Sequence, residues 1–226
     1  MSGRDRILGR VRRALADVPA DDTPYEQAVS RAYAQRHDDL GPERTADLLA
    51  ENLADYRALV HRCEAAGLPA LIARLLAERG ARSVLVPPGL EESWLARSRR
   101  TLPDTVWVAD RADSTPYALD RVDSVVTGCA VAVAETGTIV LDGAPDQGRR
   151  RITLVPDHHI CVVRVPDQVV SSVPQALARL SPARPLTWIS GPSATSDIEL
   201  ERVEGVHGPR TLEVVLRSAG RAAPLA

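Results

Sequence analysis

The chain has 226 residues, of which 44% are hydrophobic and 26% are charged, a composition that is typical of soluble globular proteins and excludes disordered and fibrous classes. The net charge of -2, together with the lack of a basic stripe interleaved with aromatic residues, indicates that nucleic acid is not a partner. All 28 permanently cationic side chains are arginines, which excludes Schiff-base chemistry and a P-loop lysine.

The first 80 residues have the pattern of helices. Apolar residues recur at helical spacing among arginines in residues 7–15, and two prolines then break the pattern. Further helices are predicted at residues 25–36, 45–66 and 69–79, and the last two are followed by glycine as a stop signal. We therefore expect residues 1–80 to form an N-terminal helical extension, packed on a sheet or on a second subunit.

From residue 81 to residue 219 the pattern becomes that of an α/β domain, because short apolar runs alternate with helical segments. The chain is long enough for one principal core. Strands are predicted at residues 83–86, 105–108, 123–128, 138–141, 151–155, 160–165, 186–190 and 211–216. Helices are predicted at residues 94–99, 170–180 and 196–202. The β-rich runs before and after residues 156–159 indicate an antiparallel or mixed excursion within the α/β core.

Neither a signal peptide nor an apolar run of about 18 residues is present, so we expect a cytoplasmic protein with no membrane span. The three cysteines, Cys63, Cys129 and Cys161, are odd in number and far apart in the sequence. This spacing argues against a disulfide framework, a zinc ribbon and iron–sulfur ligation. We expect them to be buried thiols.

Glu135 is the first candidate site residue, because it lies in a run of valine and alanine where an unpaired carboxylate would be costly to bury. We expect it to reach solvent in a crevice or to accept hydrogen bonds from Thr136, Gly137 and Thr138. Gly137 allows a ligand to approach the backbone closely. The carboxylate is a candidate nucleophile, general base or ligand-orienting group; the alternative is a structural carboxylate that holds a turn.

A second candidate stretch runs from residue 191 to residue 199. Ser196 and Glu199 have the spacing of a capping box, which predicts the start of a helix. The stretch follows a predicted parallel strand, and open α/β sheets bind ligands at such junctions. The candidate ligand-binding residues here are Gly191, Ser193, Thr195, Asp197 and Glu199. Free N–H groups at the helix start suit a small carboxylate or phosphate; the alternative is a well-capped helix with no ligand.

Histidines give one further candidate. His207 is held on a tight turn between Gly205 and Gly208, where its imidazole can donate to a ligand or exchange protons near neutral pH; the alternative is a turn histidine bonded to the backbone. His158 and His159 are adjacent, so on a strand they point to opposite faces, and we expect no metal site. The Gly-x-Gly-x-x-Gly and Gly-x-Ser-x-Gly patterns are absent, which excludes a Rossmann dehydrogenase and a serine hydrolase.

Taken in this order, the motifs resemble the LUD domain of lactate utilization proteins, and in particular its short C-type members. The resemblance is carried by Thr127-Gly128 leading to residues 134–138, by residues 191–199 and by residues 205–209, and it covers residues 83–216. It implies a Rossmann-like α/β sheet similar to the sugar-phosphate isomerase, glucosamine-phosphate deaminase and CoA-transferase fold group, with a β-rich insertion.

The resemblance also implies a role in oxidising L-lactate to pyruvate, together with iron–sulfur lactate utilization proteins of A and B type. The B-type relative continues into cysteine-rich modules that this chain lacks, so we expect a subunit without clusters and without a cofactor of its own. CoA transferases carry a glutamate, a small polar residue and a glycine at the active site, as in Glu135-Thr136-Gly137. The alternatives are therefore a stand-alone CoA-transferase-like or isomerase-like enzyme with Glu135 as nucleophile or base, and a scaffold that assembles through its helices.

Overall fold

The computed structural model describes residues 2–18, 24–30, 34–196, 202–204 and 208–220. The chain forms two compact units, residues 1–34 and residues 35–226. The first unit contains α1 (Gly3–Ala14), which begins with a capping box between Ser2 and Asp5, and the short α2 (Tyr25–Ala28). The helix predicted at residues 25–36 thus ends after its first turn, in a segment whose tyrosine, valine and serine are poor helix formers. No helix in the described parts of the chain is long and apolar enough to cross a membrane.

The second unit is built around a six-stranded parallel sheet with the order β1-β12-β7-β4-β2-β3, which confirms the predicted α/β class. Its strands are β1 (Leu59–Glu64), β2 (Ser83–Val86), β3 (Val106–Ala109), β4 (Ser124–Thr127), β7 (His158–Val165) and β12 (Thr211–Ser218). The two central strands, β4 and the first part of β7, are buried throughout. Strands covered on both faces are continuous apolar runs, which is why the sequence predicts most of this sheet.

The first strand of this sheet corrects a prediction. Residues 45–66 were expected to form one helix, but α3 (Pro42–Asp55) ends early and β1 (Leu59–Glu64) follows it. Arg57 adopts a positive φ of 68°, and the N–H of Ala58 closes the helix end by donating to the carbonyl oxygen of Leu53 at 3.0 Å. A left-handed residue after the last turn ends a helix, and glycine is its usual sequence signal. Arginine occupies this position here, so the ending could not be read from the sequence.

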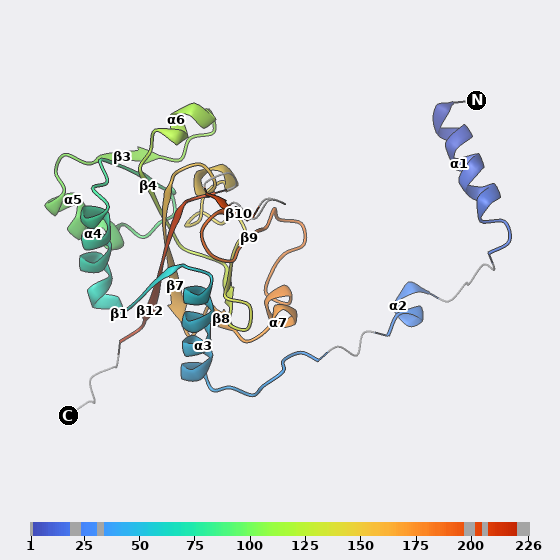
Figure 1. The fold of residues 1–226 in the computed structure, drawn as a ribbon, viewed down its shortest axis with the longest axis horizontal. Helices are drawn as coiled ribbons and strands as arrows, with labels where there is room; N and C mark the ends of the chain where they lie inside the picture. Colours follow the sequence, from blue (N-terminus) through green and yellow to red (C-terminus); the bar gives the residue numbers. More distant parts are fainter. Residues whose placement is uncertain (1, 19–23, 31–33, 197–201, 205–207, 221–226) are drawn as a thin grey trace. The chain divides into compact units, whose positions relative to one another are not determined.

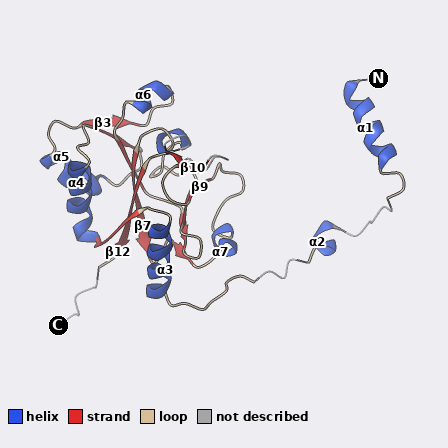
Figure 2. Cartoon of the chain, viewed as in Figure 1, coloured by secondary structure: helices blue, strands red, loops and turns tan. Residues whose placement is uncertain are grey.

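Two layers cover the central sheet (Figure 1). One face packs against α4 (Leu68–Glu78) and α5 (Glu92–Thr101), whose leucines and Trp94 contact apolar side chains of β2, β4, β7 and β12. The opposite face packs against α3 and against a second sheet. Figure 2 shows the strands of the central sheet between these two layers. Successive residues of β7 therefore face different environments, and His158 and His159 point to opposite sides.

The second sheet has four strands in the order β8-β5-β6-β9 and is mixed, as expected for the β-rich insertion. Its strands are β5 (Val131–Val133), β6 (Thr138–Leu141), β8 (Val169–Val170) and β9 (Thr187–Ile189). β5 pairs antiparallel with β6 and parallel with β8, and β9 pairs antiparallel with β6. The short helix α7 (Val173–Leu177) packs on its outer face. The helix predicted at residues 170–180 is thus shorter, because its first residue belongs to β8.

Two further predictions are wrong. Residues 151–155 were expected to form a strand, but Arg150–Thr153 is a 3-10 helix, η2, next to the helix α6 (Pro116–Asp120) in the core cluster. Residues 196–202 were expected to form a helix, but β10 (Ala194–Ser196) pairs antiparallel with β11 (Arg202–Glu204). Ser196 and Arg202 are partners in this hairpin, so strand pairing has overridden the local helix-start pattern. Residues 197–201 lie outside the described residues.

Candidate functional site

The carboxyl edge of the central sheet is the usual place for a ligand in this architecture. The strand order reverses between β2 and β4, because β3 lies on one side of β2 and β4 on the other. Open α/β sheets bind ligands just outside the carboxyl ends of the strands at such a point. The residues that follow β2 and β4 there include Gly89 and Gly128, whose backbones are open to close approach.

In this protein the loop after β6 occupies part of that crevice, and a cavity of about 340 Å³ lined by Gly89, Pro145 and Arg164 lies beside it. The N–H of Gly89 donates to the carbonyl oxygen of Pro145 at 2.9 Å, and the N–H of Gly128 donates to that of Asp146 at 3.0 Å. A Cβ atom at Gly89 would overlap the Cβ of Pro145, and one at Gly128 would lie 3.1 Å from the Cγ of Asp146. Burial raises the pKa of the Asp146 carboxyl, while the charge of Arg164 opposes that rise. The loop after β6 therefore occupies the backbone donors that a ligand would use.

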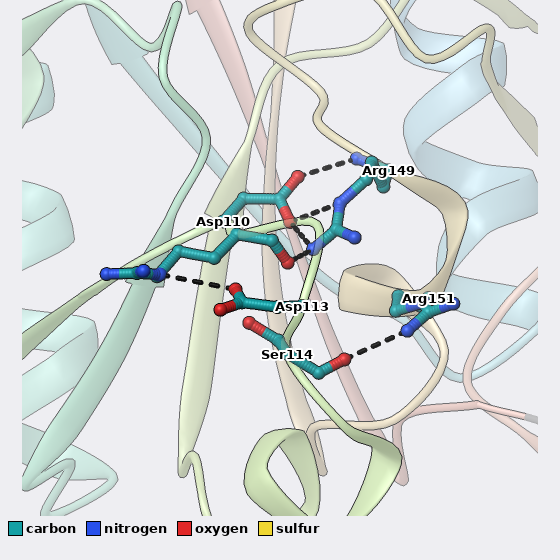
Figure 3. Close-up of polar contacts among 6 residues, drawn as sticks. Asp110, Asp113, Ser114, Arg149 and Arg151 are labelled. Atoms are coloured by element: carbon teal, nitrogen blue, oxygen red, sulfur yellow. Dashed lines mark hydrogen bonds and ion pairs between the residues drawn. The ribbon is translucent and has the colours of Figure 1, made fainter.

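Ion pairs fix the far end of this loop (Figure 3). The buried carboxylate of Asp110, after β3, accepts from the backbone N–H of Arg149 at 3.0 Å and from its Nε at 2.7 Å. The Nη2 of Arg149 donates both to Asp110 and to the carbonyl oxygen of Arg111. Arg151 donates through Nη1 to the carbonyl oxygen of Ser114 at 2.9 Å. Charge-assisted hydrogen bonds of this kind are the strong ones, so the loop is clasped to the sheet at both ends.

Glu135 lies on the turn between β5 and β6, at the opposite end of β6 from this loop. Its N–H donates to the carbonyl oxygen of Ser171 at 3.0 Å, and the side chain of Asn52 donates to its carbonyl oxygen at 3.2 Å. Its carboxylate is 23% exposed and contacts His37, with Oε2 3.1 Å from Nδ1 and Oε1 3.4 Å from the backbone nitrogen. Among the described residues the carboxylate is thus contacted by His37, rather than by the neighbouring residues 136–138 that the sequence suggested.

Hydroxyl groups join this turn to the second candidate stretch. Thr138 Oγ1 lies 2.8 Å from Thr136 Oγ1 on one side and 2.8 Å from Ser190 Oγ on the other. The next residue, Gly191, has a φ of 84° and lies so close to Tyr56 that a Cβ would overlap the carbonyl oxygen of Tyr56. Only glycine tolerates both demands. The structure therefore brings residues 136–138 and the beginning of the 191–199 stretch side by side.

A cavity of about 130 Å³ opens next to this junction. It lies at the amino ends of β7 and β12 and not at the carboxyl edge, because His159 and Leu212 line it. The 191–199 stretch follows β9, which is antiparallel to β6 in the second sheet, so the expected junction of a parallel strand with a helix is wrong. Hydroxyl side chains and glycines make up much of the lining: Thr153, Thr187, Ser190, Gly191, Ser193 and Gly208.

His159 is the one titratable side chain among the described residues that line this cavity. It is fully buried, and its Nε2 lies 2.7 Å from Thr127 Oγ1. Its Nδ1 is buried and has no hydrogen-bond partner among the described residues. Burial, followed by the neighbouring charge of His158, lowers the pKa of His159 to about 3, so the imidazole is neutral near pH 7.

The neighbouring His158 is the contrast on the other face of the sheet. Its Nδ1 lies 2.8 Å from Ser124 Oγ, and its Nε2 lies 3.2 Å from Glu213 Oε1. Glu213 Oε2 in turn lies 2.6 Å from Nε2 of His61. Burial raises the pKa of Glu213, but the hydrogen bonds and charges of the two histidines lower it more, and the net shift is downward. Both nitrogens of His158 are thus satisfied within the sheet.

The remaining predicted residues divide into two groups. Thr195 lies in β10, and the backbone N–H of Ser193 donates to the carbonyl oxygen of Pro209 at 2.8 Å. Asp197, Glu199 and His207 lie outside the described residues. The sequence analysis did not select His37, Asn52 or Ser190, because only the folded chain places them at the turn. It considered His159 only as a metal ligand.

The described residues contain two buried cysteine thiols and no cluster of metal ligands. Cys129 and Cys161 are fully buried thiols, and a hydrogen bond from Cys161 together with burial raises the pKa of Cys129 well above its ordinary value. Within the same residues no group of three or more histidine, cysteine, aspartate or glutamate side chains is placed to hold a metal ion.

Comparison with known proteins identifies the family of the chain. The model of the LUD domain matches residues 46–216. Lactate utilization protein C of Deinococcus radiodurans is 49% identical over 74% of this chain and 76% of its own length. The protein of that name from an Exiguobacterium strain is 32% identical over 96% of each chain. A crystal structure of a DUF162 family protein from Deinococcus radiodurans has a TM-score of 0.66 at 40% identity, covering 79% of this chain and 99% of the other.

Proposed function

Since the chain belongs to the LUD domain family, we propose that it is a component of an L-lactate utilization system, which oxidises lactate to pyruvate. The observation that carries this proposal is the 49% identity to a protein named lactate utilization protein C, over about three quarters of each chain.

Within such a system we propose the role of a subunit without iron–sulfur clusters. Two of the three cysteines are sealed in the core, and the thiol pKa of Cys129 is raised, which disfavours the thiolate that a cluster requires. Electrons from lactate would then pass to iron–sulfur partners of A and B type, while this chain binds a small anionic ligand or those partners. The candidate ligand-binding region combines the Glu135–Thr138 turn with the loop that begins at Gly191.

A deletion strain tests the role. We expect loss of growth on L-lactate as the only carbon source, normal growth on pyruvate, and recovery when the full chain is supplied again. A tagged copy of the chain should copurify proteins that contain iron and acid-labile sulfide. Unchanged growth of the deletion strain on L-lactate would contradict the proposal.

A second candidate is a stand-alone enzyme of CoA-transferase or isomerase type with Glu135 as nucleophile or base. It is favoured by one observation: the Glu135 carboxylate is partly exposed on a turn and lies 3.1 Å from the imidazole of His37. A nucleophile beside a basic group is the usual arrangement for covalent catalysis. Acyl-CoA followed by borohydride should then reduce a thioester on the peptide that contains Glu135, and Glu135→Gln should abolish the mass change. An unmodified wild-type peptide would remove the CoA-transferase reading, in which Glu135 is the nucleophile.

A further inference from the structure

The amino-edge cavity contains a buried polar atom that the described part of the chain leaves without a partner. His159 Nδ1 lies in a fully buried side chain that lines the cavity, while Nε2 of the same ring is engaged with Thr127. Buried polar groups are nearly always hydrogen-bonded, and each exception requires an explanation. The adjacent His158, on the other face of the same strand, has partners for both ring nitrogens. Position near the edge of the sheet therefore does not explain why Nδ1 of His159 lacks a partner.

The chemistry of the cavity limits what can satisfy this atom. The imidazole is neutral near pH 7, because burial lowers its pKa to about 3. Depending on the tautomer, Nδ1 either accepts or donates one hydrogen bond. A hydroxyl group satisfies both cases, since it is a donor and an acceptor. The lining residues within the described ranges include no cationic side chain, so none of these residues offers a counter-charge to the double negative charge of a phosphate.

The size and the rest of the lining restrict the ligand further. A cavity of about 130 Å³ is close to the roughly 150 Å³ engineered cavity that holds benzene, a molecule of six non-hydrogen atoms. Thr187 and Ser190 contribute hydroxyl groups to the lining, while Leu154, Ile189 and Leu212 contribute apolar surface. A short molecule with one apolar end and several oxygen atoms matches this division.

We propose that this cavity is a binding site for a short-chain 2-hydroxy acid, with the ligand hydroxyl hydrogen-bonded to Nδ1 of His159. The choice of a 2-hydroxy acid rests on the proposed function, whereas the recognition of a hydroxyl rests on the cavity alone. Serine and threonine hydroxyls of the lining donate to the carboxylate, and the apolar residues contact the methyl end. Ser190 links the site to the Glu135 turn through Thr138.

Nitrogen NMR of the histidine side chains in the purified full-length chain tests the site directly. On titration with L-lactate, the Nδ1 resonance of His159 should shift in a saturable manner, and the resonances of His158 should stay in place. Inorganic phosphate at the same concentrations should leave both unchanged. A His159 resonance that does not respond to L-lactate, or an equal response to phosphate, would overturn the assignment.

Two substitutions separate ligand contact from structural support. The amide of His159→Asn overlies the position of Nδ1, which faces the ligand, whereas the amide of His159→Gln overlies that of Nε2, which faces Thr127. We expect His159→Gln to weaken L-lactate binding by about tenfold to a hundredfold, the effect of losing one buried hydrogen bond, and His159→Asn to stay within roughly threefold of the wild type. Equal losses in both variants would contradict direct contact.

The outcome is separable from that of the proposed function. Binding is measured on the isolated chain, while the role in lactate utilization is measured by growth of the deletion strain. If the deletion strain fails to grow on L-lactate but the His159 resonance does not shift, the proposed binding site is wrong and the role in lactate utilization is supported. If the deletion strain grows normally but His159 shifts specifically with L-lactate, the binding site is supported and the role in lactate utilization is wrong.

Discussion

The carboxyl and amino edges of the central sheet differ in whether their polar groups have hydrogen-bond partners within the described chain. At the carboxyl edge the N–H groups of Gly89 and Gly128 donate to carbonyl oxygens of the loop after β6, and Asp110 clasps that loop through Arg149. At the amino edge His159 lines a cavity, and its Nδ1 has no hydrogen-bond partner within the described chain. The loop after β6 therefore occupies the glycine N–H groups at the usual ligand position of an α/β sheet, although a cavity lined by Gly89 and Pro145 remains beside it. The comparison shows that strand order alone does not decide which polar groups at the edges of a sheet are left without a partner.

The contrast between the two edges is tested most strongly by a substitution that pushes the loop after β6 away from the carboxyl edge. Gly89→Ala places a methyl group on top of the Cβ of Pro145 and 2.7 Å from its carbonyl carbon, and backbone cannot rotate away as a flexible side chain can. We expect a loss of about 3 kcal/mol in the free energy of unfolding, measured by urea denaturation. Gly67→Ala is the matched control, because its Cβ would make an ordinary 3.7 Å contact with Cys63, and its effect should stay within about 0.5 kcal/mol.

Stability near wild type in Gly89→Ala would mean that the loop moves away easily. The carboxyl edge would then be a site that opens, and the contrast between the two edges would fail.

The pH dependence of stability tests the amino edge. The pKa of His159 is about 3 in the folded chain and about 6.5 for an unperturbed histidine, so below pH 6.5 the unfolded state binds more protons. The free energy of unfolding should therefore fall as the pH falls, by about 2 kcal/mol between roughly pH 6.5 and 4.5 from this residue alone. Denaturation curves across this range, for the wild type and His159→Gln, measure the difference. An identical pH slope in the two proteins would show that His159 is not buried as a neutral base.

The hydrogen bonds and ion pair between Asp110 and Arg149 at the carboxyl edge give the next largest expected effect. Asp110→Ala removes the acceptor for the backbone N–H, Nε and Nη2 of Arg149. The Arg149 side chain is 34% exposed, so water replaces part of the interaction, and we expect a loss of about 1.5–2 kcal/mol. Asp113→Ala removes an exposed pair with Arg111 and should leave the free energy of unfolding unchanged within experimental error. If both substitutions cost the same in urea denaturation, the clasp contributes no more than a surface ion pair.

Most of the central sheet could be predicted from the sequence, for a physical reason. Buried parallel strands such as β2 and β4 are short apolar runs between turn residues, and that pattern is local. β1 was not predicted because α3 ends at Asp55 without the usual glycine, and Arg57 takes the left-handed conformation instead. The predicted helix at Ser196 failed because its capping pattern is also local, whereas pairing between β10 and β11 depends on the fold.

The candidate site could be predicted only in part. The sequence selected Thr138 and Gly191 as parts of two separate motifs, and the folded chain places Ser190, next to Gly191, within 2.8 Å of Thr138. It did not select His159 as a ligand contact, since a histidine in an apolar strand gives no local sign of which ring nitrogen lacks a partner. It also placed the 191–199 stretch at the carboxyl end of a parallel strand, because the antiparallel pairing of β9 with β6 cannot be read from a local apolar run. The catalytic role of Glu135 stays a prediction.

The smallest effect tests the connection between the Glu135 turn and the cavity. Thr138→Val keeps the shape of the side chain but removes the hydroxyl that lies between Thr136 and Ser190. We expect a loss of about 1 kcal/mol in the free energy of unfolding, since Thr138 is buried, and a weaker response of His159 to L-lactate, since Ser190 loses its orienting partner. Thr101→Val is the control, because its exposed hydroxyl bonds only within its own helix and its loss should be within experimental error. If Thr138→Val lowers stability but leaves the His159 response intact, the hydroxyl chain supports the fold without reaching the ligand, and the amino edge then contains two independent parts.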